Sequence, residues 1–403
     1  MPIPTRSAGL QRLDAFLPAA GESYARRRNY DHGAGNHEHV SGLSPWLRHR
    51  LILEAEVLDA VLARHGAESV SKFIDEVFWR TYFRGWMAHR PTVWPRYQDE
   101  VERARERAAG NSGLAAAIAD AEAGRTGNEA FDHWARELVD TGYLHNHARM
   151  WFASIWVFTF GLPWALGADF FLRHLLDGDP ASNTLGWRWV SGLHTRGKTY
   201  LARRDNILKY TNGRLDPGPD LAQRAEALEE AEPPGEAGLD LPPEPPPGAT
   251  GTASSPEDGW LLTEEDCRGQ DGEAPLDGPV AGLLTTDGRS PARVADPVCA
   301  FGRGAVEDAL ERSGADGPVF HADATDELLS WAADTGLRRL HVMHAPYGPV
   351  ADALATIEPR LEDAGVTLQP HLRGYDRRAW PFANRGFFKL RKRIPGLLDA
   401  MAA

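Results

Sequence analysis

Apolar side chains recur at helical spacing through the first 210 residues of the chain. Between residues 47 and 64 the helical spacing is carried by Leu47, Leu51, Val57, Leu58, Val61 and Leu62, and residues 70–87 are richer still in large apolar side chains. Three further helices are predicted at 129–139, 145–160 and 168–176. The segment 145–160 is apolar on nearly every side, so we expect it to be buried.

The pattern changes after Asp216. Residues 217–278 are rich in Pro, Gly, Glu and Ala and hold few large apolar side chains, which predicts an extended linker. Beyond it, strand-like runs at 280–284, 340–344 and 366–368 alternate with helical stretches at 305–312, 325–333 and 350–364. This alternation predicts a parallel sheet. We therefore expect a mainly α protein with a helical domain at 1–216, a linker at 217–278 and a small α/β domain at 279–403.

Charge is distributed unevenly along the 403 residues, whose formal net charge is -13. Residues 217–300 carry 4 basic against 18 acidic side chains, whereas residues 1–216 carry 27 against 25. The helical part is therefore free to present a basic face to phosphate. No apolar run is long enough to span a membrane and the N-terminus lacks an apolar signal core, so we expect a cytoplasmic protein without a membrane partner. Cys267 and Cys299 are too few for a disulfide framework.

The residues with the strongest chemical character lie between 145 and 189. They are His-Asn-His-Ala-Arg-Met at 145–150, Trp164, Asp-Gly-Asp-Pro-Ala-Ser-Asn at 177–183 and Gly-Trp-Arg-Trp at 186–189. Arg149 and Asp177 stand among apolar residues, so each needs a partner of opposite charge. Ser41 and Ser44 stand at a predicted helix start, where hydroxyls and backbone amides can bind a pyrophosphate, although Ser-Pro helix starts are also common caps.

These motifs resemble the FAD-binding helical domain of the photolyase and cryptochrome family, over about residues 10–215. Segments at 24–29, 41–48 and 76–80 resemble the family's earlier motifs in the same order. The resemblance implies FAD as the cofactor, with Arg149 and Asp177 paired beside the isoalloxazine, Asp179 at its pyrimidine ring and Asn183 facing flavin N5. The cofactor-binding residues that it implies are Tyr24, Ser41, Gly42, Leu43, Ser44, Phe73, Arg80, Asn146, Arg149, Asp177, Asp179 and Asn183.

The resemblance further implies a lyase that uses blue light to repair ultraviolet-damaged DNA. Trp187 and Trp164 match the first two links of the tryptophan chain that reduces the photoexcited flavin. The third link is not found, and Trp94, Trp151 or Trp156 are alternative exits. A cleft for a cyclobutane pyrimidine dimer would be lined by Glu76, Trp79, Asn146, Met150 and Trp189, which with Asn183, Trp187 and Trp164 form the predicted catalytic set.

Two other functions remain open, a cryptochrome-like photoreceptor without repair activity and a flavoenzyme that acts on a small molecule. The family's usual N-terminal antenna domain does not precede Tyr24, whereas residues 340–348 and the strand at 366–368 loosely resemble the last part of such a domain. His32, His37 and His39 lie in a polar stretch without carboxylate or cysteine partners in a fixed pattern. This favours a solvated loop over a metal site, and no metal is predicted.

Overall fold

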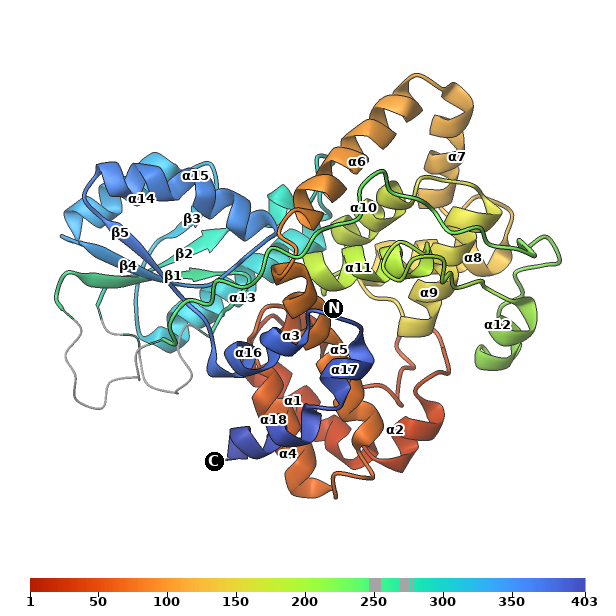
Figure 1. Ribbon diagram of the computed structural model, residues 1–403, viewed down its shortest axis with the longest axis horizontal. Helices are drawn as coiled ribbons and strands as arrows, with labels where there is room; N and C mark the ends of the chain where they lie inside the picture. Colours follow the sequence, from red (N-terminus) through yellow and green to blue (C-terminus); the bar gives the residue numbers. More distant parts are fainter. Residues whose placement is uncertain (246–254, 269–275, 277, 403) are drawn as a thin grey trace.

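The computed structural model describes residues 1–245, 255–268, 276 and 278–402, which form a helical body and a parallel sheet side by side (Figure 1). Among these residues, no helix combines the length and apolar character needed to cross a membrane. The helices before the sheet are α1 (Arg6–Phe16), α2 (Glu22–Arg27), α3 (Ser44–Arg48), α4 (Glu54–Arg64), α5 (Ser71–Ala88), α6 (Val93–Ala109), α7 (Ser112–Glu122), α8 (Glu129–Thr141), α9 (Asn146–Ser154), α10 (Trp164–His174), α11 (Pro180–Val190) and α12 (Arg204–Tyr210).

Local signals explain where several of these helices begin and end. Asn128 caps α8 by accepting a hydrogen bond from the amide of Phe131, and Gly142 ends the helix in the left-handed conformation, at φ 69°. The predicted helix at 145–160 is confirmed in position, but its second half, Ile155–Thr159, is a π-helical turn. Periodicity does not distinguish such a turn from regular α-helix, because both place apolar side chains on the buried side.

The sheet contains β1 (Asp258–Thr263), β2 (Val280–Leu284), β3 (Val319–His321), β4 (Arg339–Met343) and β5 (Thr367–His371). All neighbouring strands are parallel, in the order β3-β2-β1-β4-β5, which confirms the predicted parallel sheet. Helix α13 (Asp296–Ser313) covers the face toward the helical body, and α14 (Thr325–Asp334) and α15 (Pro349–Asp363) cover the other. The central strand β1 lies within the stretch predicted as linker, because its short apolar run is surrounded by Pro, Gly and acidic residues.

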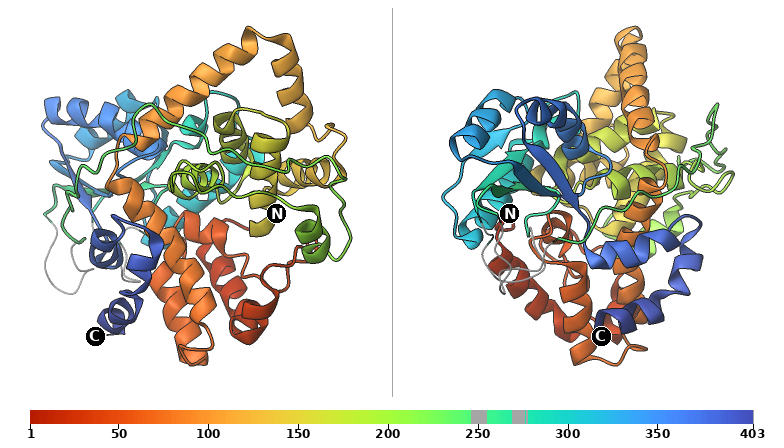
Figure 2. Two further views of the ribbon diagram at one scale, coloured as in Figure 1. Left: turned by 45° about the vertical axis from the view of Figure 1, so that its right-hand side comes forward. Right: turned by 60° about the vertical axis from the view of Figure 1, so that its left-hand side comes forward.

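The chain returns to the helical body after β5. Helices α16 (Gly374–Ala379), α17 (Phe387–Arg391) and α18 (Ile394–Ala402) lie beside α4 and α5 (Figures 1 and 2). Gly85 permits the approach to α5, since a Cβ there would lie 2.7 Å from Cβ of Ala383 and 2.9 Å from Cδ1 of Trp380. The last 30 residues, predicted as part of the α/β domain, therefore pack on the helical one.

The described residues 217–245 contain no helix or strand, and they run along the surface from the helical body to the sheet (Figure 1). Backbone hydrogen bonds hold this segment in place. Leu228 donates to the carbonyl of Ser191 at 3.0 Å, Ala237 donates to His89 at 2.9 Å, and Pro243 accepts from Leu372 at 2.8 Å. Residues 246–254, 269–275 and 277 of the predicted linker lie outside the described residues.

Candidate functional site

An ion pair between a buried carboxylate and a half-buried arginine joins α9 to the segment before α11. Nη2 of Arg149 lies 2.7 Å from Oδ2 of Asp177, and its Nε donates to the carbonyl of Leu144 at 2.9 Å. Burial opposes the charge of Arg149, but Asp177 raises its pKa above the usual value. The other carboxylate oxygen of Asp177, Oδ1, is buried, and no described residue donates a hydrogen bond to it. Arg149 and Asp177 are thus paired as expected, and Oδ1 of Asp177 is available to accept a hydrogen bond from a ligand.

Asp179 caps the N-terminus of α11. It accepts a hydrogen bond from the amide of Ser182 at 2.7 Å, and Pro180 is the first helical residue. An Asp-Pro step is a strong helix-start signal. Burial opposes ionisation, but the guanidinium groups of Arg80, Arg48 and Arg84 hold the pKa of Asp179 well below its usual value.

Asn183 and Trp187 are one turn apart on α11 and therefore share a face. The amide nitrogen of Asn183 donates to the carbonyl of Ala168 on α10 at 2.8 Å. Trp187 is buried against Phe171, with ring centroids 5.1 Å apart. Gly167 makes room for this indole, since a Cβ there would lie 2.3 Å from its Cη2 atom.

Among the other tryptophans named as electron-transfer candidates, Trp151 stacks on Trp134 of α8, with ring centroids 5.4 Å apart. Trp156 lies 6.2 Å from Trp187 between ring centroids. Trp164 packs against Tyr97 at 5.9 Å, and Tyr97 packs against Trp94 at 5.4 Å. The indole of Trp94 is itself buried and donates to Asp352 of α15. Aromatic side chains therefore continue from Trp164 toward the sheet, where the sequence offered only separate candidates.

The residues predicted to line the lesion cleft are not all free to do so. Asn146 is exposed and Met150 is half-buried, one turn apart on α9. Glu76 forms an ion pair with Arg28, and burial raises its pKa despite that charge. The ring of Trp79 stacks on Phe387 of α17, with centroids 3.8 Å apart and planes at 12°.

Trp189 stacks on Tyr200 at 5.6 Å, so the two indoles predicted to hold the lesion each have another aromatic partner. Neither contact follows from the sequence pattern, because Tyr200 and Phe387 lie outside the helices that carry the indoles.

Helix α1 supports the predicted pyrophosphate-binding segment at residues 41–44 through hydrogen bonds. Arg12 donates to the carbonyls of Ser41 at 2.6 Å and of Val40 at 3.1 Å. Gly42 adopts φ 62°, and Leu43 is buried at the N-cap of α3. Helix α3 begins at Ser44, as predicted.

Tyr24 and Phe73, two further residues of the predicted cofactor set, meet edge to face at 5.2 Å. Tyr24 comes from α2 and Phe73 from α5, so the contact joins these two helices.

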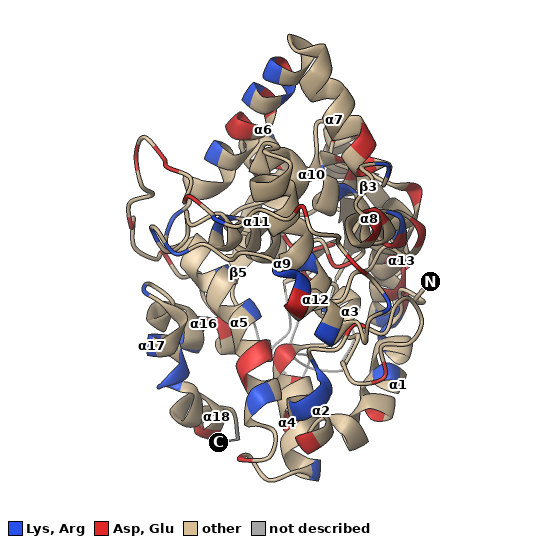
Figure 3. Cartoon of the chain, turned by 90° about the vertical axis from the view of Figure 1, so that its right-hand side faces the viewer, with Lys and Arg blue, Asp and Glu red and all other residues tan. Residues whose placement is uncertain are grey.

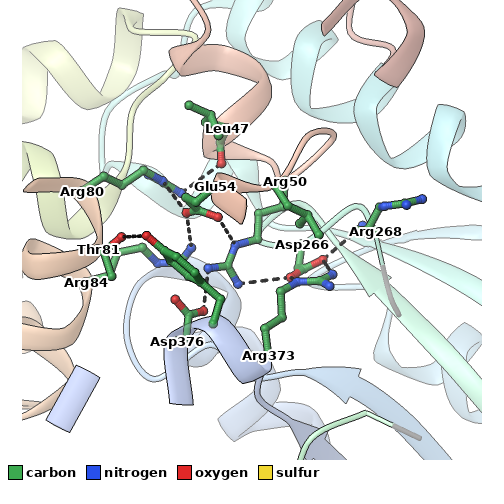
Figure 4. A network of polar contacts seen from close by, with 12 residues as sticks. Leu47, Arg50, Glu54, Arg80, Thr81, Arg84, Asp266, Arg268, Arg373 and Asp376 are labelled. Atoms are coloured by element: carbon green, nitrogen blue, oxygen red, sulfur yellow. Dashed lines mark hydrogen bonds and ion pairs between the residues drawn. The ribbon is translucent and has the colours of Figure 1, made fainter. Parts of the chain in front are cut away.

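A buried ion network connects Asp179 and α5 to the C-terminal part of the chain (Figure 4). Arg80 binds Asp179 at 3.0 Å and Glu54 at 3.1 Å, and Glu54 lies 3.4 Å from Arg50. Arg50 in turn binds Asp266, in the loop after β1, at 3.3 Å, and Asp376 of α16 at 2.5 Å. Burial opposes ionisation, but the three arginines around Glu54 lower its pKa to about 2. Sequence reasoning missed this network because its members are up to 326 residues apart.

Charge on the face seen in Figure 3 is mixed. Helices α2, α12 and α17 lie on this face, and each carries basic segments. Acidic segments lie between them, so the face is not uniformly basic. The basic residues in the last turns of these helices are Arg26, Arg27, Lys209, Lys389 and Arg391.

Comparison with known proteins identifies the helical body. Residues 73–218 match the family model for the FAD binding domain of DNA photolyase. The chain contains this FAD-binding domain. The matched residues include Phe73, Arg80, Arg149, Asp177 and Asn183.

The relatives of this photolyase domain are deoxyribodipyrimidine photo-lyases. That of Thermus thermophilus is 34% identical over 215 residues, covering 52% of this chain and 48% of the relative. That of Streptomyces griseus is 30% identical over 238 residues, covering 51% and 49%. The crystal structure of a bacterial class III photolyase from Agrobacterium tumefaciens matches with 27% identity over 52% of this chain and 42% of that chain, at a TM-score of 0.43. The chain thus spans about half the length of the curated relatives it matches.

The described residues fit FAD as the cofactor of the photolyase domain. Asp177 presents a buried oxygen without a donor, and the indole nitrogen of Trp187 is likewise buried without an acceptor among the described residues. Arg149 remains one quarter exposed on the same side of α9 as Asn146, so its guanidinium is accessible to a ligand. Buried polar atoms without partners at a half-open arginine are typical of a ligand site.

Acid is expected to destabilise the photolyase domain through its buried histidines. Burial lowers the pKa of His145 to about 4, and burial together with Arg188 and Arg90 lowers that of His194 to about 4. Between pH 6.5 and 4 the unfolded chain therefore binds protons that the folded protein does not, and the free energy of unfolding falls as pH falls. At pH 5 the loss should reach up to about 2 kcal/mol per histidine. Urea denaturation at pH 7 and pH 5 measures it.

His194→Gln provides the control for this pH dependence. The variant should lose part of the difference between the two pH values, because glutamine does not titrate. An unchanged or higher stability at pH 5 in the unmodified protein would contradict the assignment.

Proposed function

We propose that this protein is a light-driven photolyase that repairs cyclobutane pyrimidine dimers in ultraviolet-damaged DNA. The observation that carries the proposal is the Arg149–Asp177 pair, with its spare acceptor oxygen, inside a domain of the photolyase family. After absorbing light, the bound, reduced FAD would donate an electron to the dimer, the cyclobutane ring would open, and the electron would return to the flavin.

The protein's own residues would orient the flavin and the damaged base and tune the electrostatic environment of the flavin. Arg149 and Asp177 would fix the flavin ring system through a charge pair that needs no rearrangement, and Asn183 would present a neutral amide to it. Asn146 and Met150 share a helix with Arg149, so a flipped-out base that reaches them lies beside the flavin-binding pair. Ser41 and Ser44 would bind the pyrophosphate.

One specific observation favours a second candidate, a photoreceptor without repair activity. Phe387 comes from α17, outside the matched domain, and covers one face of Trp79, the indole expected to stack on the lesion. In a photoreceptor, the same contact would couple the cofactor region to the C-terminal helices.

Illumination with damaged DNA separates the two. Purified protein carrying its flavin is mixed with an ultraviolet-irradiated oligonucleotide under reducing conditions and exposed to blue light. Light-dependent loss of dimers supports the photolyase. Photoreduction without loss of dimers supports the photoreceptor, and absence of both leaves only a flavoenzyme without photochemistry.

Trp187→Phe is expected to slow photoreduction of the oxidised flavin by about tenfold, which corresponds to about 1.4 kcal/mol in the barrier. Trp187 shares a face of α11 with Asn183, and phenylalanine keeps an aromatic ring against Phe171 but is much harder to oxidise. Trp331→Phe on α14 of the sheet is the matched control and should leave the rate unchanged. Equal rates in the two variants would remove Trp187 from the path.

A further inference from the structure

A cluster of possible metal ligands lies between α8 and the loop that precedes the predicted phosphate segment. One ligand atom from each of Asp31, His37 and Glu137 lies within 4.8 Å of the others. The sequence predicted a solvated loop for His37, and the structure corrects this, since only 12% of the side chain is exposed. Its carboxylate neighbours are Asp31, at the start of the same loop, and Glu137, 100 residues further along the chain. No local sequence pattern reveals this contact.

Polar atoms of His37 and Glu137 in this cluster have no hydrogen-bond partner among the described residues. The side chain of Glu137 is only 3% exposed, and no described residue donates a hydrogen bond to its Oε2 atom. Both ring nitrogens of His37 are likewise buried without a partner among the described residues. A buried carboxylate oxygen without a donor is costly, so a further partner would stabilise the cluster.

The separations suit two ligands of one ion. Nε2 of His37 lies 3.6 Å from Oε1 of Glu137, and Nε2 of His133 lies 3.4 Å from Oε2. Hydrogen bonds between nitrogen and oxygen are usually about 2.7–3.2 Å long. Tetrahedral ligands of Zn²⁺ at about 2.0–2.1 Å from the metal are about 3.3 Å from one another. His133 and Glu137 are also one turn apart on α8, so both reach the same point.

We propose that Asp31, His37 and Glu137 bind a divalent transition-metal ion of the Zn²⁺ type, with His133 at the edge of the site. Imidazole and carboxylate ligands suit Zn²⁺ and disfavour Mg²⁺, which prefers oxygen alone. The guanidinium of Arg214 lies 3.1 Å from Asp31 and donates to His133 at 3.0 Å, so a bound ion would compete with this partly exposed side chain for both residues.

Asp31 retains its other partners when the metal binds. Its carboxylate accepts hydrogen bonds from the amide of Gly33 at 2.9 Å and from the indole of Trp134 at 3.0 Å. Each carboxylate oxygen has two lone pairs, so one remains for the ion. These bonds orient the ligand, as supporting hydrogen bonds do in metal sites.

The ion would fasten residues 31–37 to α8. The ring of His37 also stacks on His145, the N-cap of α9, with centroids 5.7 Å apart. Because α9 carries Arg149 and the loop leads to Ser41, the site would support two parts of the cofactor region without touching the reaction. The inference does not depend on repair activity.

Calorimetric titration of the chelator-treated, flavin-containing protein with Zn²⁺ tests the site. We expect one ion per chain. His37→Ala should weaken binding by at least about 100-fold, since loss of mere supporting partners costs 10–100-fold. Glu137→Gln keeps the shape of the side chain and should weaken it similarly, and it serves if His37→Ala does not fold.

His39→Ala is the matched control, because His39 lies two residues away and pairs with Arg27 instead. It should bind Zn²⁺ as the unmodified protein does. Absence of saturable binding overturns the proposal, as does binding that survives both His37→Ala and Glu137→Gln or is lost in His39→Ala.

Discussion

Replacement of Arg50 by alanine is expected to lower the free energy of unfolding by about 3–5 kcal/mol, the usual cost of removing one partner from a buried ion pair. The side chain is 3% exposed, and it is bound to Glu54, Asp266 and Asp376. Burial opposes its charge, yet these carboxylates raise the pKa of Arg50 well above its usual value. Without it, carboxylates from α4, the β1 loop and α16 lose a shared counter-charge.

Urea denaturation followed by tryptophan fluorescence measures this loss. Arg204→Ala is the matched control, because Arg204 forms an ion pair with Asp216 on the surface. Exposed pairs contribute little, so its midpoint should stay close to that of the unmodified protein. If Arg50→Ala unfolds at the same urea concentration as Arg204→Ala, the network does not hold the sheet to the helical body.

The Asp177→Asn variant should bind FAD at least about 30-fold more weakly, equivalent to about 2 kcal/mol, because truncating one partner of a buried charge pair costs about 2–5 kcal/mol. Asparagine keeps the size of the side chain but leaves Arg149 without its counter-charge at 2.7 Å. It also replaces the carboxylate that offers the unpartnered oxygen.

Fluorescence titration of the flavin-free protein with FAD gives the affinity. Asp205→Asn is the control, since Asp205 is 76% exposed and faces Arg203 at 3.7 Å on the surface. Circular dichroism establishes that both variants are folded. Equal FAD affinities for the two variants would show that the Arg149–Asp177 pair serves the packing of α9 alone.

The network around Arg50 also bears on the predicted antenna-like domain. In open parallel sheets, ligands bind outside the carboxyl ends of the strands where the strand order reverses, here between β1 and β4. At the end of β1, Glu265 binds Arg48 at 2.6 Å and the carbonyl of Glu264 faces the ring of His49 at 2.7 Å. The carboxyl end of β1 is therefore an interface with the helical body.

The sequence by itself determined the elements whose signals are local. Helix α8 follows from its cap at Asn128 and its apolar face, because its hydrogen bonds join residues close in the chain. Strand β2 occupies the predicted residues 280–284, because a short apolar run is the local signal of a buried strand. The FAD-binding domain followed from motifs within 145–189. Two charges in apolar surroundings each need a partner, and the resemblance to the family implied that Arg149 pairs with Asp177.

Only the tertiary structure decided which side chains from distant segments meet. Arg28 binds Glu76, Phe387 covers Trp79, and His37 turns toward Glu137, and no spacing rule relates these residues. The strand β1 was hidden because its six residues stabilise the fold only when paired with β2 and β4 on either side. Periodicity describes how one segment presents its own face, whereas contacts across hundreds of residues depend on how all the segments pack at once.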